Sequence, residues 1–148
     1  IKECDWSSDV CSSDLPLPTI RGQPRLVYQP ALYDKLIALN PSPANCLEFC
    51  CGTIAEMSEG DIYESVERYA ERIAYVHLRN VHGKVPHYRE TFIDEGDIDV
   101  GRVLRILRQK GFAGIIIPDH APQMTCAAPW HAGMAFAMGY LKAKLETL

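Results

Sequence analysis

The fold of this chain is decided by the stretch Gly114-Ile115-Ile116-Ile117-Pro118-Asp119-His120. Three consecutive isoleucines form an apolar, β-branched run, which is typical of a strand buried on both faces in a parallel sheet. Pro118 cannot donate a hydrogen bond to a sheet, so we expect the strand to end there. Asp119 and His120 follow at the carboxyl end of that strand, where α/β proteins keep their chemistry. The alternative is that Asp119 caps the next segment and His120 is an ordinary loop residue.

Length, charge and cysteine content limit the classes of protein that fit. The chain has 148 residues, which is enough for one domain with a core. A net charge of −4 gives no reason to expect a nucleic-acid partner. No apolar run approaches the roughly 20 residues that a membrane span needs. The six cysteines lack the spacing of a disulfide framework, so we expect a reducing, cytoplasmic setting.

Residues 1–15 differ in character from the rest of the chain. Ser-Ser-Asp occurs at Ser7–Asp9 and again at Ser12–Asp14, without a helical or strand period. We expect this segment to be a non-native, disordered leader that resembles a translated sequencing adapter, with a genuine disordered leader as the alternative. The native start would then lie upstream, and residues 16–148 would be the folded portion.

The remainder alternates between helical and strand patterns. Apolar spacing and capping residues predict helices over about 30–39, 61–72, 99–110 and 132–145, strands over 47–50, 73–78 and 114–118, and a polar connection over 82–96. This alternation indicates a parallel sheet built from βαβ units. No glycine-rich phosphate fingerprint follows any strand, which argues against a Rossmann nucleotide site. Three such units cannot close a barrel of about 250 residues. The predicted fold class is therefore α/β, the C-terminal part of a (β/α)8 TIM barrel.

Each predicted strand ends in a residue that can bind a metal ion: Cys50, His77 and Asp119. Because the carboxyl ends of parallel strands meet at one edge of a sheet, we expect the three side chains to converge. A thiolate, an imidazole and a carboxylate together suit a divalent ion such as Mn²⁺, Fe²⁺, Co²⁺ or Zn²⁺. Taken singly, a cysteine such as Cys50 is more often a small buried apolar residue, and a histidine such as His77 is more often a core residue. Their coincidence with Asp119 at three strand ends favours a shared site.

Arg79 and Asn80 directly follow His77 and are predicted to bind substrate. The guanidinium of Arg79 could hold a carboxylate through two hydrogen bonds, or it could form a salt bridge at the rim of the barrel. Glu90 and Asp94 are interpreted as solvated or capping groups, although a loop on this face could direct one of them at a substrate hydroxyl.

These residues lie in motifs that resemble the mannonate dehydratase family of the xylose-isomerase-like barrel superfamily. The matching segments are Phe49–Thr53, Val76–Val81 and Pro118–His120, with support from Glu90–Asp97 and Gly139–Lys142. The resemblance implies an α/β barrel that dehydrates D-mannonate to 2-keto-3-deoxy-D-gluconate in hexuronate breakdown. It also implies a divalent ion, Mn²⁺ or Fe²⁺, and a small sugar acid as the partner. A homo-oligomer is one option for the full-length parent.

The resemblance assigns roles to particular residues. Cys50, His77 and Asp119 match three of the four metal ligands of the family, and the fourth, a histidine, would lie upstream. His120 matches a residue that takes part in proton transfer. The family places a catalytic tyrosine further on, but residues 128–133 contain none. His131 is predicted to substitute for it as the proton donor.

Two other functions fit the same residues. A sugar isomerase or epimerase of the superfamily would share the metal geometry and differ in substrate. A truncated, non-catalytic polypeptide would expose a sheet edge that favours assembly or aggregation. For the 148-residue chain by itself, we expect little or no turnover.

Overall fold

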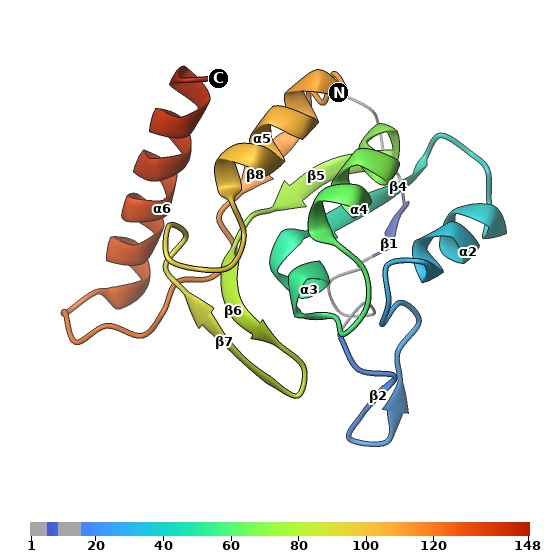
Figure 1. The fold of residues 1–148 in the computed structure, drawn as a ribbon, viewed down its shortest axis with the longest axis horizontal. Coiled ribbons are helices and arrows are strands. Elements are labelled where there is room, and N and C mark those ends of the chain that lie inside the picture. The colour runs from blue at the N-terminus through green and yellow to red at the C-terminus, as the bar shows by residue number, and fades with distance from the viewer. Residues whose placement is uncertain (1–5, 9–15) are drawn as a thin grey trace.

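The computed structural model describes residues 6–8 and 16–148, and its centre is a parallel sheet (Figure 1). The strand order is β1-β4-β5-β8, and each neighbouring pair is parallel. The strands are β1 (Trp6–Ser8), β4 (Asn45–Cys50), β5 (Ile73–His77) and β8 (Ile115–Ile117). The predicted α/β alternation of three strands with helices is confirmed within these residues.

Helices and two short hairpins connect the strands. The helices are α2 (Leu32–Leu39), α3 (Cys51–Glu56), α4 (Ile62–Tyr69), the 3₁₀ turn η1 (Ala70–Arg72), α5 (Val100–Gln109) and α6 (Pro129–Glu146). The antiparallel hairpins pair β2 (Thr19–Ile20) with β3 (Gln23–Pro24) and β6 (Asn80–Lys84) with β7 (His87–Thr91). Asp61 caps α4 by accepting from the backbone N–H groups of Tyr63 and Glu64, and Asp99 caps α5 by accepting from that of Arg102. These caps explain why both helices begin where the sequence predicts.

Helices α4 and α5 cover one face of the sheet, and the core lies between the sheet and these helices (Figure 1). Alternate residues of the strands point to this face, and Leu47, Phe49 and Val76 are fully buried there. Val66 of α4 and Leu104 of α5 belong to the same buried cluster, and each lies on the apolar stripe of its helix. The side chains at the intervening strand positions, including Glu48, Cys50 and His77, are therefore on the opposite face.

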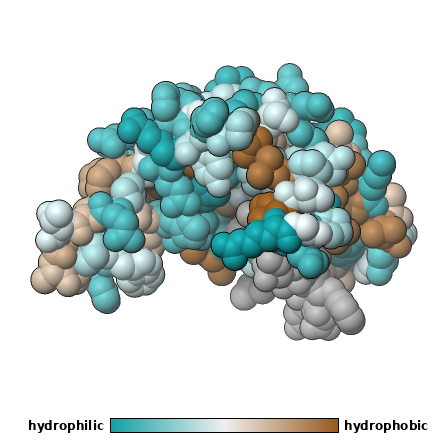
Figure 2. Space-filling model, turned by 90° about the horizontal axis from the view of Figure 1, so that it is seen from below, coloured by the Kyte–Doolittle hydropathy of each residue, from teal (hydrophilic) through white to brown (hydrophobic). Residues whose placement is uncertain are grey.

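The prediction that the isoleucine strand is buried on both faces is wrong. Ile115 is 67% exposed and Ile117 is 37% exposed, whereas Ile116 packs against the core. The cause is that β8 is the last strand of the described sheet, and no described helix covers its second face. Seen from below, the molecule is hollowed on one side, between the end that carries α6 and the rest (Figure 2).

Helix α3 and the two hairpins were not predicted from the sequence. Gly52, which follows β4, lies inside helix α3. The polar connection over 82–96 contains the β6–β7 hairpin, whose residues 82–90 are mostly exposed and show no apolar alternation. Gly83 has a φ of +86°, which an L side chain rarely adopts, so a glycine is required in β6.

The predicted leader lies mostly outside the described residues. Trp6–Ser8 is described, and it pairs with Asn45–Leu47 of β4. The non-native origin of residues 1–15 stays a prediction. Among the described residues, no helix is long and apolar enough to cross a membrane.

Asn80 fixes the segment between β7 and α5 against the start of β6. Its amide nitrogen donates to the carbonyl oxygens of Ile93 at 2.8 Å and Ile98 at 3.0 Å. Its amide oxygen accepts from the backbone N–H groups of Val81 and Ile98, both at 3.0 Å. Gly96 lies so close that an added Cβ would overlap the Asn80 amide. The conformation of this segment therefore requires the asparagine at position 80 and a residue without a side chain at position 96.

We expect Gly96→Ala to lower the free energy of unfolding by about 1–3 kcal/mol, because the new methyl group displaces a buried, hydrogen-bonded amide. The control is Gly139→Ala in α6, where no atom lies within 4 Å of the added Cβ. There alanine should be neutral or stabilise the helix by up to about 1 kcal/mol. Urea unfolding of both variants checks this, and equal stability would contradict the proposed close contact.

Candidate metal centre and its surroundings

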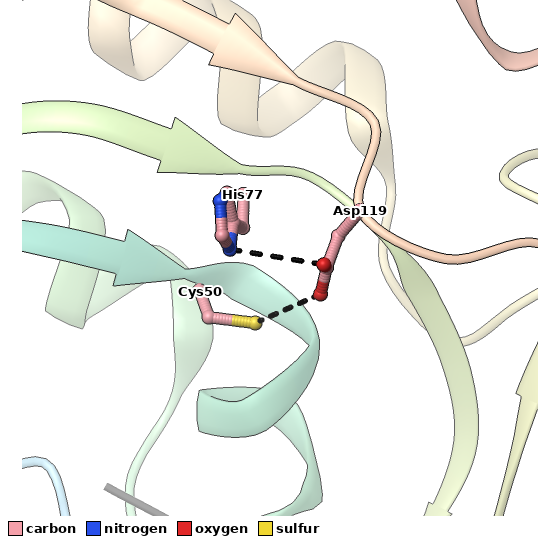
Figure 3. Close-up of side chains that lie close together, drawn as sticks. All are labelled: Cys50, His77 and Asp119. Carbon is pink, nitrogen blue, oxygen red and sulfur yellow. Dashed lines mark hydrogen bonds and ion pairs between the residues drawn. The ribbon is translucent and has the colours of Figure 1, made fainter. Parts of the chain in front are cut away.

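Cys50, His77 and Asp119 lie together at the carboxyl ends of neighbouring strands (Figure 3). Cys50 pairs in register with His77, and His77 pairs with Ile117, two residues before Asp119. The Cys50 Sγ is 4.0 Å from Asp119 Oδ2, and His77 Nδ1 is 3.8 Å from Asp119 Oδ1. One ligand atom from each residue lies within 4.8 Å of the others. The sheet register thus brings the three predicted ligands to one place.

The donor set fits a divalent transition-metal ion. Ligand atoms bound to one ion at about 2.0–2.3 Å lie roughly 3–4 Å from one another, so small side-chain shifts would suffice. Cys50 is buried, while His77 and Asp119 are partly accessible. The neighbouring Cys51 does not lie beside the other candidate ligands but belongs to the core cluster. Burial raises the pKa of its thiol well above the usual value. Of the two adjacent cysteines, Cys50 alone faces the other candidate ligands.

Glu48 is a buried carboxylate beside this cluster that sequence analysis missed. It lies two residues before Cys50 and so on the same face of β4. Its Oε1 is 2.9 Å from His77 Nδ1, and its side chain is only 4% exposed. This is the same ring nitrogen that lies 3.8 Å from Asp119 Oδ1, so Glu48 orients the imidazole ring from within the cluster. The available signal was a charged residue placed between Leu47 and Phe49, which are both apolar strand residues.

Arg79 lies at the centre of a group of carboxylates. Its Nη1 donates to Glu56 Oε1 at 2.5 Å, and its Nη2 donates to Thr53 Oγ1 at 3.3 Å. Nη1 is also 3.5 Å from Glu90 Oε1, and Nε is 3.4 Å from Asp119 Oδ2. The structure therefore contains the salt bridge that the sequence left as one of two options for Arg79.

The Arg79–Glu56 pair is almost inaccessible to solvent, with side chains 8% and 1% exposed. Gly52 of α3 makes room for it, because an added Cβ there would come within 2.6 Å of Arg79 Cγ and 2.8 Å of its Nη1. Burial raises the pKa of Glu56, and the hydrogen bond and charge of Arg79 offset part of that rise. The Phe49–Thr53 motif thus combines a candidate ligand with the space that the arginine needs.

The four hydrogen bonds of Asn80 to backbone groups leave its amide without a free donor or acceptor position. The predicted substrate-binding role of Asn80 consequently has no support from its contacts, which instead position the backbone around the site.

The predicted proton-transfer residues are placed differently from each other. His120 adjoins the cluster: its Nδ1 is 2.8 Å from Glu90 Oε1 and its Nε2 is 3.5 Å from Asp119 Oδ1. Burial lowers the pKa of His120, but the hydrogen bond to Glu90 and the charges of Asp119 and Glu90 outweigh this effect and raise it. His131 lies in the first turn of α6, edge-on to Trp130 with ring centres 5.3 Å apart. Among the described residues, no hydrogen bond or ion pair joins His131 to the cluster.

We expect Arg79→Ala to destabilise the chain by about 3–5 kcal/mol, since it leaves Glu56 buried without its partner. The matched control is Arg68→Ala, which breaks a 2.6 Å pair with Asp34 whose side chains are 65% and 46% exposed. That loss should cost only about 0.2–1 kcal/mol. Chemical denaturation of the two variants tests the difference, and similar losses would contradict the buried character of the Arg79 pair.

Comparison with known proteins places this geometry in a family. The family model described as D-mannonate dehydratase (UxuA) matches residues 1–141. A mannonate dehydratase of Oceanobacillus iheyensis is 32% identical over 113 residues, covering 72% of this chain and 32% of the relative. That of Bacillus subtilis (strain 168) is 33% identical over 113 residues, covering 72% of this chain and 30% of the relative. The chain thus spans about a third of the length of these curated relatives.

Solved structures agree with the sequence relatives. The crystal structure of mannonate dehydratase from Streptococcus suis serotype 2 superposes with a TM-score of 0.78 at 25% identity, over 89% of this chain and 40% of that one. A xylose isomerase domain protein from Planctomyces limnophilus, with a TM-score of 0.70 at 16% identity over 85% of this chain and 48% of that one, shares the fold. The predicted fold class, part of a TIM barrel, is confirmed by these likenesses. By the match of its family model over most of its length, the chain belongs to the mannonate dehydratase family.

Proposed function

We propose that the protein to which these residues belong catalyses the metal-dependent dehydration of D-mannonate to 2-keto-3-deoxy-D-gluconate, a step of hexuronate breakdown. Membership of the family supports the reaction class. The observation that carries the proposal is the convergence of Cys50, His77 and Asp119 beside His120 and Arg79. A thiolate, an imidazole and a carboxylate would hold Mn²⁺ or Fe²⁺.

The reaction removes a proton from C2 and a hydroxide from C3, and the resulting enol becomes the 2-keto acid. A divalent ion held by Cys50, His77 and Asp119 would supply Lewis-acid stabilisation of the negative charge that develops on the substrate carboxylate when the C2 proton is removed. His120, beside the proposed ligand Asp119, takes the C2 proton. A second group must protonate the departing 3-hydroxyl, and we assign this role to His131 in the absence of a tyrosine over residues 128–133.

Arg79 is proposed to act on the substrate through its charge rather than through two parallel hydrogen bonds. Nη1 and Nη2 donate to Glu56 and Thr53. Within the described residues, the buried Nε has no hydrogen-bond acceptor, although it lies 3.4 Å from Asp119 Oδ2. The positive charge beside Asp119 would attract the carboxylate of a sugar acid bound there.

The metal site is tested by cobalt binding to the 148-residue chain. We expect Co²⁺ to produce a thiolate-to-cobalt absorption band that Cys50→Ser abolishes and Asp119→Asn weakens. The control is Cys126→Ser, because Cys126 is an exposed cysteine outside the cluster, and its replacement should leave the band unchanged. A band that survives Cys50→Ser would remove Cys50 from the ligand set.

Activity requires a separate test, because we expect the chain alone to show little or no turnover. In a chimaera, residues 16–148 replace the aligned segment of the Oceanobacillus iheyensis relative. We expect it to form the 2-keto-3-deoxy acid from D-mannonate, to lose activity on chelation and to regain it with Mn²⁺. His120→Asn should lower kcat by about 10²–10⁴-fold.

The same assay separates the alternatives. Turnover of aldoses or ketoses but not of D-mannonate would favour an isomerase or epimerase. A folded, metal-binding chimaera without either activity would favour a non-catalytic polypeptide. Dehydration by the purified 148-residue chain would contradict the expected inactivity of the chain alone.

A further inference from the structure

We propose that Glu90 is a positioning residue that holds His120 as the tautomer protonated on Nδ1, with Nε2 turned towards the candidate metal ligands. The catalytic meaning of this arrangement rests on the proposed function, since it would leave the Nε2 lone pair to accept the C2 proton. The pairing itself is a property of the chain and can be tested without substrate.

The two ring nitrogens of His120 have different neighbours. Nδ1 lies 2.8 Å from Glu90 Oε1, within hydrogen-bond distance, whereas Nε2 lies 3.5 Å from Asp119 Oδ1. A carboxylate accepts hydrogen bonds and cannot donate them when ionised, so contact with Glu90 requires a proton on Nδ1. A neutral imidazole then carries its lone pair on Nε2.

The carboxylate of Glu90 is itself held in place. The same Oε1 atom that meets His120 is 3.5 Å from Arg79 Nη1. Arg79 cannot easily move, because Glu56 and Thr53 accept its hydrogen bonds in the interior. The buried guanidinium thus provides a fixed positive charge against which Glu90 is oriented.

The backbone of Glu90 is anchored as well. In the β6–β7 hairpin, Glu90 pairs with Val81, a fully buried residue. The Val81 carbonyl accepts from the Asp97 N–H at 2.7 Å, and its own N–H donates to Asn80 Oδ1 at 3.0 Å. Glu90 therefore lies in a strand at the base of the hairpin rather than in a loop, and its side chain is 37% exposed, as the solvated-group interpretation expected.

The hairpin also supplies an internal control. His82 Nδ1 lies 2.7 Å from Asp97 Oδ1, in a pair whose side chains are 60% and 53% exposed. In this second pair, as in the first, a carboxylate oxygen meets the Nδ1 atom of a histidine. Among the described residues, no hydrogen bond or ion pair is seen between this pair and a candidate ligand. Asp97→Ala should alter His82 and leave His120 unchanged.

The test is a long-range ¹H–¹⁵N correlation spectrum of the histidine side chains of the full 148-residue chain, with His120 assigned by His120→Asn. At a pH where His120 is neutral, we expect wild-type His120 to show the Nδ1–H tautomer. Glu90→Ala should shift it to the Nε2–H form that free imidazole side chains prefer. Glu90→Gln should retain part of the Nδ1–H form, because the amide oxygen still accepts.

Two results would overturn the proposal: an Nε2–H tautomer for His120 in the wild-type chain, or an unchanged tautomer in a folded Glu90→Ala variant. The wild-type spectrum decides the matter even if Glu90→Ala fails to fold. In the chimaera, Glu90→Ala should lower kcat about tenfold or more with little change in KM, and Glu90→Gln should restore part of it. Absence of mannonate turnover in the parent chimaera, together with an Nδ1–H signal, would refute the proposed function and leave the positioning of His120 standing.

Discussion

The buried ion pair between Arg79 and Glu56 is the interaction on which the arrangement of the site depends. Removing two charges from water costs several kcal/mol for each ion, and only close contact and further hydrogen bonds compensate for it. Thr53 supplies one such bond, and Gly52 leaves the space that the guanidinium occupies. Because Arg79 follows β5 and Glu56 ends α3, the pair joins the segments after two neighbouring strands. From this fixed point the guanidinium approaches both Asp119 and Glu90.

The sheet provides the second constraint, since parallel register sets the distances between strand ends. Phe49, Val76 and Ile116 form a row that faces the helices, while Cys50, His77 and Ile117 form the next row on the other face. A shift of one residue in any strand would exchange these rows. The apolar packing of one face therefore determines which polar side chains meet on the other.

Much of this arrangement could be predicted from the sequence, because it follows from local rules. The caps Asp61 and Asp99, the apolar stripes of α4 and α5, and the strands that end at Cys50 and His77 all have short-range signals. The unpredicted parts depend on contacts distant in sequence. The role of Glu48 depends on its contact with His77, which is distant in sequence and leaves no local pattern. The hairpin that carries Glu90 has no apolar alternation, because it is mostly exposed. The exposure of Ile115 depends on what packs against the sheet edge, which no local pattern encodes.

The β6–β7 hairpin is tied to the interior at both of its ends. At its base, Glu90 pairs with the buried Val81, and at its turn the Val85 N–H donates to the carbonyl oxygen of Glu56 at 2.9 Å. Glu56 is also the ion-pair partner of Arg79, which in turn lies 3.5 Å from Glu90. An insertion or deletion in this turn would therefore displace the backbone of Glu56 and disturb the buried ion pair, although the turn itself lies apart from the three candidate ligands in sequence.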